Sequence, residues 1–168
     1  ELTREAERTM YARFSHDSGS SFGKELRVSN PALGACACCS LATEYLDEDT
    51  LVIAYRSAID GIGRHMQILS LEGVSAEPQS GQYQTLQPLQ QWEATFCPLS
   101  TNDIAASDTG EHWIVFETEG RIVEMNLANP DKIARAGGPF IETRQKNPTL
   151  AFNSQGEKLI AWGEAISH

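Results

Sequence analysis

The fold predicted for this chain is decided by the stretch Ser15-His16-Asp17-Ser18-Gly19-Ser20-Ser21-Phe22, which has the composition of a tight turn. The carboxylate of Asp17 can accept hydrogen bonds from backbone N–H groups of its own turn. Gly19 permits a positive φ, and Phe22 supplies a ring that folds back onto the adjoining sheet. Strand-like segments at 10–15 and 24–29 flank the turn, so this stretch predicts a β-hairpin.

Short strands of the same kind continue along the whole chain, separated by turns rich in Asp and Gly. Only about the first ten residues have helix-favouring composition. The predicted strands span residues 10–15, 24–29, 40–45, 51–56, 65–71, 98–105, 112–118, 121–127, 149–153 and 158–163. This series predicts an all-β protein.

Three segments repeat along the chain at a spacing of about fifty residues. They are Cys39-Ser40-Leu41-Ala42, Cys97-Pro98-Leu99-Ser100 and Asn147-Pro148-Thr149-Leu150. Each is followed by a turn and then by an apolar strand that carries an aromatic residue. A period of this length, filled by four short strands, is typical of a β-propeller blade. The repeat therefore predicts a β-propeller of four-stranded antiparallel blades.

The stretch from Ser15 to Phe22 resembles the Asp-box, or bacterial neuraminidase repeat, whose pattern is Ser-x-Asp-x-Gly-x-Thr-(Trp/Phe). Ser15, Asp17, Gly19 and Phe22 match this pattern, and Ser21 replaces the usual Thr. The chain is similar to sialidase-like propeller proteins in other segments too, namely the cysteine-rich segment, Ala54-Tyr55-Arg56, Cys97-Pro98 and Ala161-Trp162. The Arg-Ile-Pro motif of the sialidase catalytic site does not occur.

The resemblance implies a division of the chain into blades, because the Asp-box joins the third and fourth strands of a sialidase-like blade. It implies an outer half-blade at about 10–30, a complete blade at about 36–90, a second at about 95–143 and an inner half-blade at about 147–168. We therefore expect about three blades of a ring that has about six when complete. The remainder of the ring would come from a longer polypeptide or a second chain.

The position of the Asp-box within its blade also assigns each connecting loop to one of the two faces of the propeller. The face opposite the Asp-box receives residues 36–39, 56–65, 90–97, 117–121, 144–147 and 164–168. Ligand sites of propellers gather over the channel on such a face, so we expect a glycan or a protein partner to bind there.

The candidate ligand-binding residues on this face are Arg56, Asp60, Arg64 and Trp92. Arginine supplies the guanidinium fork that a carboxylate ligand such as a sialic acid needs, and a tryptophan can stack on a sugar ring. The alternative is structural. Arg56 would then pair with a neighbouring carboxylate, Asp60 would make a turn, and Trp92 would cover the edge of a blade.

Four cysteines, Cys36, Cys38, Cys39 and Cys97, occupy equivalent positions before two innermost strands, so their thiols are expected to approach one another. A disulfide between Cys97 and one of the other three is the plainer interpretation in an oxidising compartment. Thiolates would also suit Cu(I) or Zn²⁺, and a reactive thiol is a third interpretation. No other cofactor is expected.

The chain carries 23 acidic and 13 basic side chains, which gives a net charge of −10. Binding of a phosphate backbone needs a basic face, so no nucleic-acid partner is expected. The longest apolar run, Leu51-Val52-Ile53-Ala54-Tyr55, is too short to cross a bilayer as a helix. No charged-then-apolar stretch follows Glu1, so we expect that any targeting segment has been removed or was not included. The family resemblance implies a periplasmic or secreted protein.

Three functions follow from these observations. The first is a recognition or scaffold module for a glycan or protein partner, on a segment of an exported sialidase-like propeller. The alternative is part of an exo-glycosidase of the sialidase type, with catalytic residues outside this segment. The third is a metal-binding propeller that uses the cysteine thiolates. No pair of carboxylates is selected by its spacing as an acid–base pair, so the catalytic residues are unknown.

Overall fold

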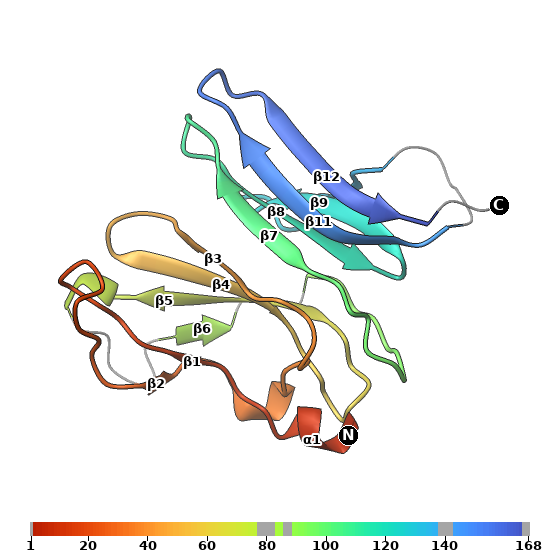
Figure 1. The fold of residues 1–168 in the computed structure, drawn as a ribbon, viewed down its shortest axis with the longest axis horizontal. Coiled ribbons are helices and arrows are strands. Elements are labelled where there is room, and N and C mark those ends of the chain that lie inside the picture. The colour runs from red at the N-terminus through yellow and green to blue at the C-terminus, as the bar shows by residue number, and fades with distance from the viewer. Residues whose placement is uncertain (1, 77–82, 86–88, 138–142, 166–168) are drawn as a thin grey trace.

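The protein, described by a computed structural model at residues 2–76, 83–85, 89–137 and 143–165, is built from short antiparallel sheets (Figure 1). Its elements are α1 (Leu2–Ala6), β1 (Tyr11–Ala12), β2 (Leu26–Arg27), η1 (Pro31–Leu33), β3 (Ala42–Tyr45), β4 (Thr50–Arg56), β5 (Met66–Glu72), η2 (Val74–Ala76), β6 (Tyr83–Thr85), β7 (Asn102–Ala106), β8 (His112–Thr118), β9 (Arg121–Asn126), β10 (Ile133–Arg135), β11 (Gln145–Phe152) and β12 (Lys158–Glu164). The prediction of an all-β fold is confirmed.

The strands form four sheets that follow one another in chain order. Two are four-stranded meanders, β3-β4-β5-β6 and β7-β8-β9-β10, and two are hairpins, β1-β2 and β11-β12. Every pair of described strands is antiparallel and joins neighbours in sequence. The described strands do not close into a ring or barrel.

Each predicted strand overlaps an observed one, and β6 and β10 were not predicted from the sequence. Both are three-residue strands at the outer edges of the four-stranded sheets, too short to show an alternating pattern. Strand β11 begins at Gln145, earlier than predicted, because the register shifts between Lys146 and Thr149. Asn147 has a positive φ of 54° at this bulge, which lets the strand continue past Pro148.

Strands β4 and β5 are buried on both faces, and alternate side chains enter two different cores. Val52 and Ala54 face one core together with Ile114 and Phe116 of the next sheet. That core comprises Ala42, Val52, Ala54, Met66, Ile68, Ile104, Ile114, Phe116, Val123 and Met125. The other comprises Val28, Ala35, Leu51, Ile53, Tyr55, Leu69, Leu71 and Val74. The β3–β6 sheet is therefore a middle layer between the N-terminal segment and the β7–β10 sheet.

The β7–β10 sheet is covered on its far side by β11, which lies against β7, β8 and β9. Asp103 of β7 accepts hydrogen bonds from the Thr149 hydroxyl (2.7 Å) and the Leu150 backbone N–H (2.9 Å) of β11. Figure 1 shows the result: the β11–β12 hairpin, in blue, lies over the green and cyan strands of this sheet. Every described sheet thus packs against its neighbour in sequence.

The turn from Ser15 to Phe22 is closed by hydrogen bonds to Asp17. Its carboxylate accepts from the Ser21 backbone N–H (2.8 Å), the Ser21 hydroxyl (2.6 Å) and the Ser15 hydroxyl (2.7 Å). Gly19 has a φ of 84°, as expected for this position. Phe22 is 52% exposed, and its ring lies under the Arg13 guanidinium at 5.8 Å instead of packing within the core.

These hydrogen bonds, the one from the Ser21 hydroxyl first, lower the pKa of Asp17 to about 2. Because the pKa of Asp17 is lowered in the folded protein, its hydrogen bonds stabilise the turn at pH values above the ordinary carboxyl pKa. This stabilisation is lost as the pH falls through the folded pKa. In an NMR titration of the side-chain carboxyl carbons, Asp17 should titrate near pH 2. Ser21→Ala should raise this pKa, whereas the control Ser21→Thr keeps the hydroxyl and should leave it low. Equal pKa values in all three proteins would contradict this account of the turn.

Candidate functional site

The loops that precede β3 and β7 meet because these two strands lie side by side in neighbouring sheets. Just past the cysteines, Asn102 of β7 donates from its side chain to the carbonyl of Ser40 (2.8 Å) and from its backbone N–H to the Ser40 hydroxyl (3.3 Å). The same junction recurs one sheet later, where the Asn147 N–H donates to the Ser100 hydroxyl (3.2 Å). The sequence repeat therefore corresponds to a repeated contact between successive sheets.

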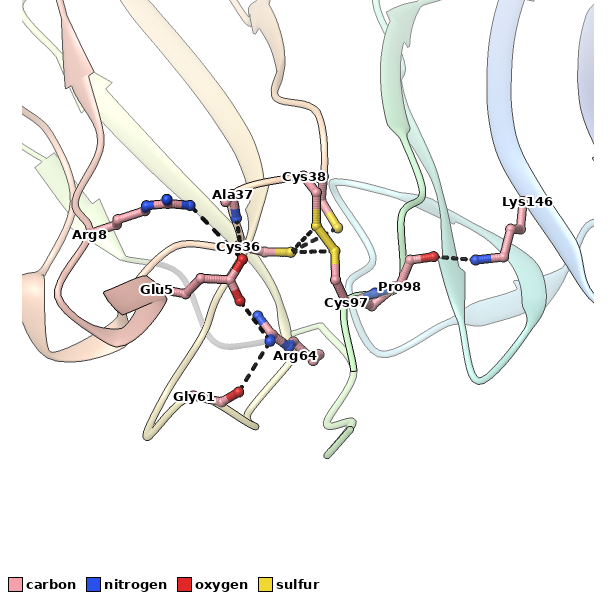
Figure 2. The surroundings of a disulfide bond; sticks show 11 residues. Glu5, Arg8, Cys36, Ala37, Cys38, Gly61, Arg64, Cys97, Pro98 and Lys146 are labelled. Carbon is pink, nitrogen blue, oxygen red and sulfur yellow. Dashed lines mark hydrogen bonds and ion pairs between the residues drawn. A yellow bond between two sulfur atoms is a disulfide. The ribbon is translucent and has the colours of Figure 1, made fainter. Parts of the chain in front are cut away.

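Four sulfur atoms gather at the first of these junctions, as Figure 2 shows. Cys38 and Cys97 form a disulfide whose Cα atoms are 6.9 Å apart, and it links the two four-stranded sheets. Cys36 and Cys39 remain as thiols. The Cys36 sulfur lies 3.5 Å from that of Cys38, 3.1 Å from that of Cys39 and 3.6 Å from that of Cys97. All four sulfurs lie within 4.8 Å of one another, close enough to bind one metal ion.

The two free thiols have opposite proton affinities. The hydrogen bond between the Cys36 and Cys39 sulfurs lowers the pKa of Cys36, and the Cys38 backbone N–H and the charge of Arg64 add smaller contributions against the opposite effect of burial. The same hydrogen bond raises the pKa of Cys39, and burial raises it further. Of the two thiols, Cys36 therefore loses its proton more readily, although it is buried.

Arg56, one of the predicted ligand-binding residues, is 3% exposed and joins the two four-stranded sheets. Its guanidinium donates to the carbonyls of Arg64 (2.9 Å) and of Glu117 at the end of β8 (2.5 Å). The ring of Trp92 covers the guanidinium at 5.1 Å. Ligand binding by Arg56 stays a prediction, because the described contacts of its guanidinium are all with other residues of the protein.

Arg64 is fully buried, and its Nη2 atom pairs with the Glu5 carboxylate at 2.7 Å. The second carboxylate oxygen of Glu5 accepts from the Ala37 backbone N–H (2.9 Å), beside the cysteines. Gly34, with a φ of 58°, makes room for α1, because a Cβ there would lie 2.9 Å from the carbonyl oxygen of Glu5. Glu5 thus occupies the position at Arg64 that a carboxylate ligand would need.

The Glu5 pair gives a pH-dependent contribution to stability. Burial raises the pKa of Glu5, but the Ala37 N–H and the Arg64 guanidinium outweigh it and the pKa is lowered. The stabilisation is therefore present above the ordinary carboxyl value of 4.5 and is lost as the pH falls below it.

Replacing Glu5→Gln should lower the free energy of unfolding by about 3 kcal/mol at pH 7, because Arg64 is left buried without its counter-charge. Urea denaturation measures this difference, which should shrink at acidic pH. Glu7→Gln, an exposed carboxylate just beyond α1, is the matched control and should have little effect. A similar loss in both variants would show that the ion pair has no special role.

The other two predicted ligand-binding residues lie close by. Trp92 is partly buried, and its backbone carbonyl accepts from the Arg64 N–H (2.7 Å). Asp60 is exposed and has a positive φ of 51° in the turn before Gly61, which is the geometry of a turn residue. The structure thus brings Arg56, Arg64 and Trp92 together beside the cysteines.

A cleft of about 480 Å³ lies at the loop between β8 and β9. Among the described residues that line it, Arg121, Arg135 and Arg144 are basic and Glu119 is acidic. The remaining lining residues are Gln90, Thr118, Gly120, Val123 and Thr143. The described lining thus carries more basic than acidic side chains, in a chain whose net charge is −10.

The floor of the cleft is held by buried polar contacts. Gln145 accepts from the Ile122 N–H (3.1 Å), and its side-chain amide donates to Glu164 (3.2 Å). The Thr143 hydroxyl donates to the same carboxylate (2.6 Å) and is the first cause of the lowered pKa of Glu164. Gly120 packs beneath Arg144, whose Cγ would lie 3.3 Å from a Cβ at that position.

An aromatic contact connects the cleft to the cysteine region. The Arg144 guanidinium lies over the ring of Phe96 at 5.4 Å, and Phe96 meets Trp92 edge to face at 6.1 Å between ring centres. Trp92 in turn covers Arg56. Arg56 and Arg144 therefore lie at the two ends of the Trp92–Phe96 ring pair, at the boundary between the two four-stranded sheets.

The three arginines of the cleft were not among the predicted ligand-binding residues. Residues 117–121 and 144–147 were expected on the face opposite the Asp-box, and Arg121 directly follows the turn residues Glu119 and Gly120, both with positive φ. The available signal was therefore the presence of Arg121 and Arg144 in loops that were expected on one face. Arg135 lies on β10, a strand that the sequence did not reveal.

Comparison with known proteins finds no family model, no curated protein and no solved structure that matches this chain. No helix among the described residues is long and apolar enough to span a membrane. A disulfide is typical of proteins from oxidising compartments, and the Cys38–Cys97 bond agrees with such a location.

Proposed function

We propose that this chain is an arc of a sialidase-like β-propeller that acts as a recognition module for an anionic glycan or protein partner. The stacking of the sheets supports the first part. Each four-stranded meander packs face to face on the next, and the first strands β3 and β7 lie side by side, with β11 beside β7. Successive first strands that line up in this way are what a propeller hub requires.

The observation that carries the binding function is the cleft lined by Arg121, Arg135 and Arg144. Guanidinium groups match a carboxylate in geometry and charge, and the rest of the chain is strongly acidic. Arg135 and Arg144 are exposed and available to a ligand, whereas Arg121 also donates to the carbonyl of Thr143 (2.5 Å). The cleft thus supplies the exposed cationic groups that the buried Arg56 and Arg64 do not.

N-acetylneuraminic acid tests this proposal, with its neutral methyl ester as the matched ligand. The acid should bind in isothermal titration calorimetry more tightly than the ester. Arg135→Ala and Arg144→Ala should each weaken binding of the acid by about tenfold, the value of one charge-assisted hydrogen bond. Arg27→Ala, an exposed arginine on β2, is the control and should bind normally.

Two results would contradict the proposal. One is equal binding of the acid and its ester, which would mean that the carboxylate is not recognised. The other is unchanged binding in both cleft variants with the fold intact by circular dichroism, which would place the ligand elsewhere.

A second function is favoured by the proximity of the four cysteine sulfurs. We propose that this cluster is a metal centre for a thiophilic ion, Cu or Zn. A periplasmic or secreted location fits the disulfide and the resemblance to exported sialidase-like proteins.

A further inference from the structure

The four sulfurs lie within 4.8 Å of one another, which is close to the spacing of ligands around one metal ion. In a zinc site with Zn–S bonds of about 2.3 Å, neighbouring sulfurs lie about 3.8 Å apart. The Cys36 sulfur is already 3.1–3.6 Å from the other three. Only the disulfide between Cys38 and Cys97 holds two sulfurs much closer than a metal ion allows.

Two buried guanidinium groups flank the cluster and supply positive charge. Arg56 interacts with the sulfurs of Cys39 and Cys36, and Arg64 with that of Cys36. Nε of Arg56 and both Nε and Nη1 of Arg64 are buried and have no hydrogen-bond partner among the described residues. Buried donors of this kind are costly unless an anion faces them.

The charge favours Zn²⁺ over Cu(I). Four thiolates around Zn²⁺ carry an excess charge of −2, which the two guanidiniums can offset, whereas Cu(I) would leave −3. Glu5 takes up part of the Arg64 charge, but it is itself paired on its outer side with Arg8 at 3.9 Å. Glu117 takes up part of the Arg56 charge in the same way, so the guanidiniums offset part of the excess charge, and the smaller excess of a zinc tetrathiolate is the easier one to accommodate.

From this arrangement we infer that Cys36, Cys38, Cys39 and Cys97 form a four-thiolate Zn²⁺ site that is closed by the Cys38–Cys97 disulfide and opened by its reduction. The inference rests on the metal-centre function proposed above and adds its metal, its full ligand set and its control by redox state.

The chemistry balances with an external dithiol as reductant. Cys38 is the exposed member of the pair, so a thiolate of the reductant attacks its sulfur and releases Cys97 as a thiolate. The second thiol of the reductant then displaces Cys38 and leaves as a cyclic disulfide, having supplied both electrons. Zn²⁺ next forms four Zn–S bonds, and the protons that remain on the thiols pass to the buffer.

The test compares the whole chain in its oxidised and its phosphine-reduced states under nitrogen. Zn²⁺ affinity is measured by competition with a chromophoric chelator, stoichiometry by native mass spectrometry, and sulfur ligation by the ultraviolet thiolate-to-metal absorption of the Cd²⁺ form. Reduced protein should bind one ion per chain and at least about 100-fold more tightly than oxidised protein, which offers only Cys36 and Cys39.

Cys97→Ser removes one ligand and the disulfide together, and should weaken binding by the reduced protein by about 100-fold or more. Ala37→Ser is the control, since it places the same hydroxyl beside the cluster, in the loop before β3, without removing a thiol. The oxidised wild type needs no substitution, so the comparison stands even if Cys97→Ser fails to fold.

The outcomes separate the two proposals. Equal binding in both redox states would overturn the control by the disulfide but keep the metal centre. Tight binding of Cu(I) alone would overturn the assignment of zinc and keep the metal centre. Unchanged Zn²⁺ binding in Cys97→Ser would overturn the four-thiolate site. Failure of the reduced protein to bind any thiophilic ion would overturn both proposals and leave the arginine-lined cleft unaffected.

Discussion

Strands β4 and β5 bury both of their faces, and this requires a sheet on each side of them. Their alternate side chains divide between two apolar cores, one shared with β7–β9 and one with the N-terminal segment. The sheets must therefore stack face to face in chain order. The cysteine cluster, the buried arginines and the cleft depend on this stacking, because each is assembled from loops of different sheets.

The stacking also explains why charged groups are tolerated at the boundary between sheets. Arg56 and Arg64 are buried, yet backbone carbonyls, Glu5 and the ring of Trp92 surround them. These contacts lie where the apolar cores end and the connecting loops begin. The same boundary carries the Cys38–Cys97 disulfide, whose span of 59 residues stabilises the fold by about 4 kcal/mol in the chain-entropy model.

The longer strands of the fold could be predicted from the sequence because their apolar runs are bounded by turn chemistry. Strand β4 is an example: Leu51 to Tyr55 form an uninterrupted apolar run after an acidic turn. Strands β6 and β10 could not be found, since their pairing depends on neighbours already in place. Closure into a propeller likewise depends on how all the sheets pack together and not on the residues of a single sheet.

The candidate site was predictable in part. The equivalence of Cys39 and Cys97 in the repeat was enough to expect that the thiols meet, but not to say that Cys38 forms the bond. The burial of Arg56 and Arg64 could not be foreseen, because it arises from contacts with Glu117 and Glu5, far away in sequence. Sequence shows which groups are available, and the tertiary packing decides which of them face solvent.

The most direct test of the stacked arrangement is a peptide map of the protein digested with trypsin without reduction. Cleavage yields peptides 28–56, with Cys36, Cys38 and Cys39, and 65–121, with Cys97. The structure predicts that these two peptides are recovered as one disulfide-linked species from the monomer, with fragmentation assigning the bond to Cys38. Recovery of 65–121 alone, or linked only between molecules, would contradict the meeting of the two sheets at this junction.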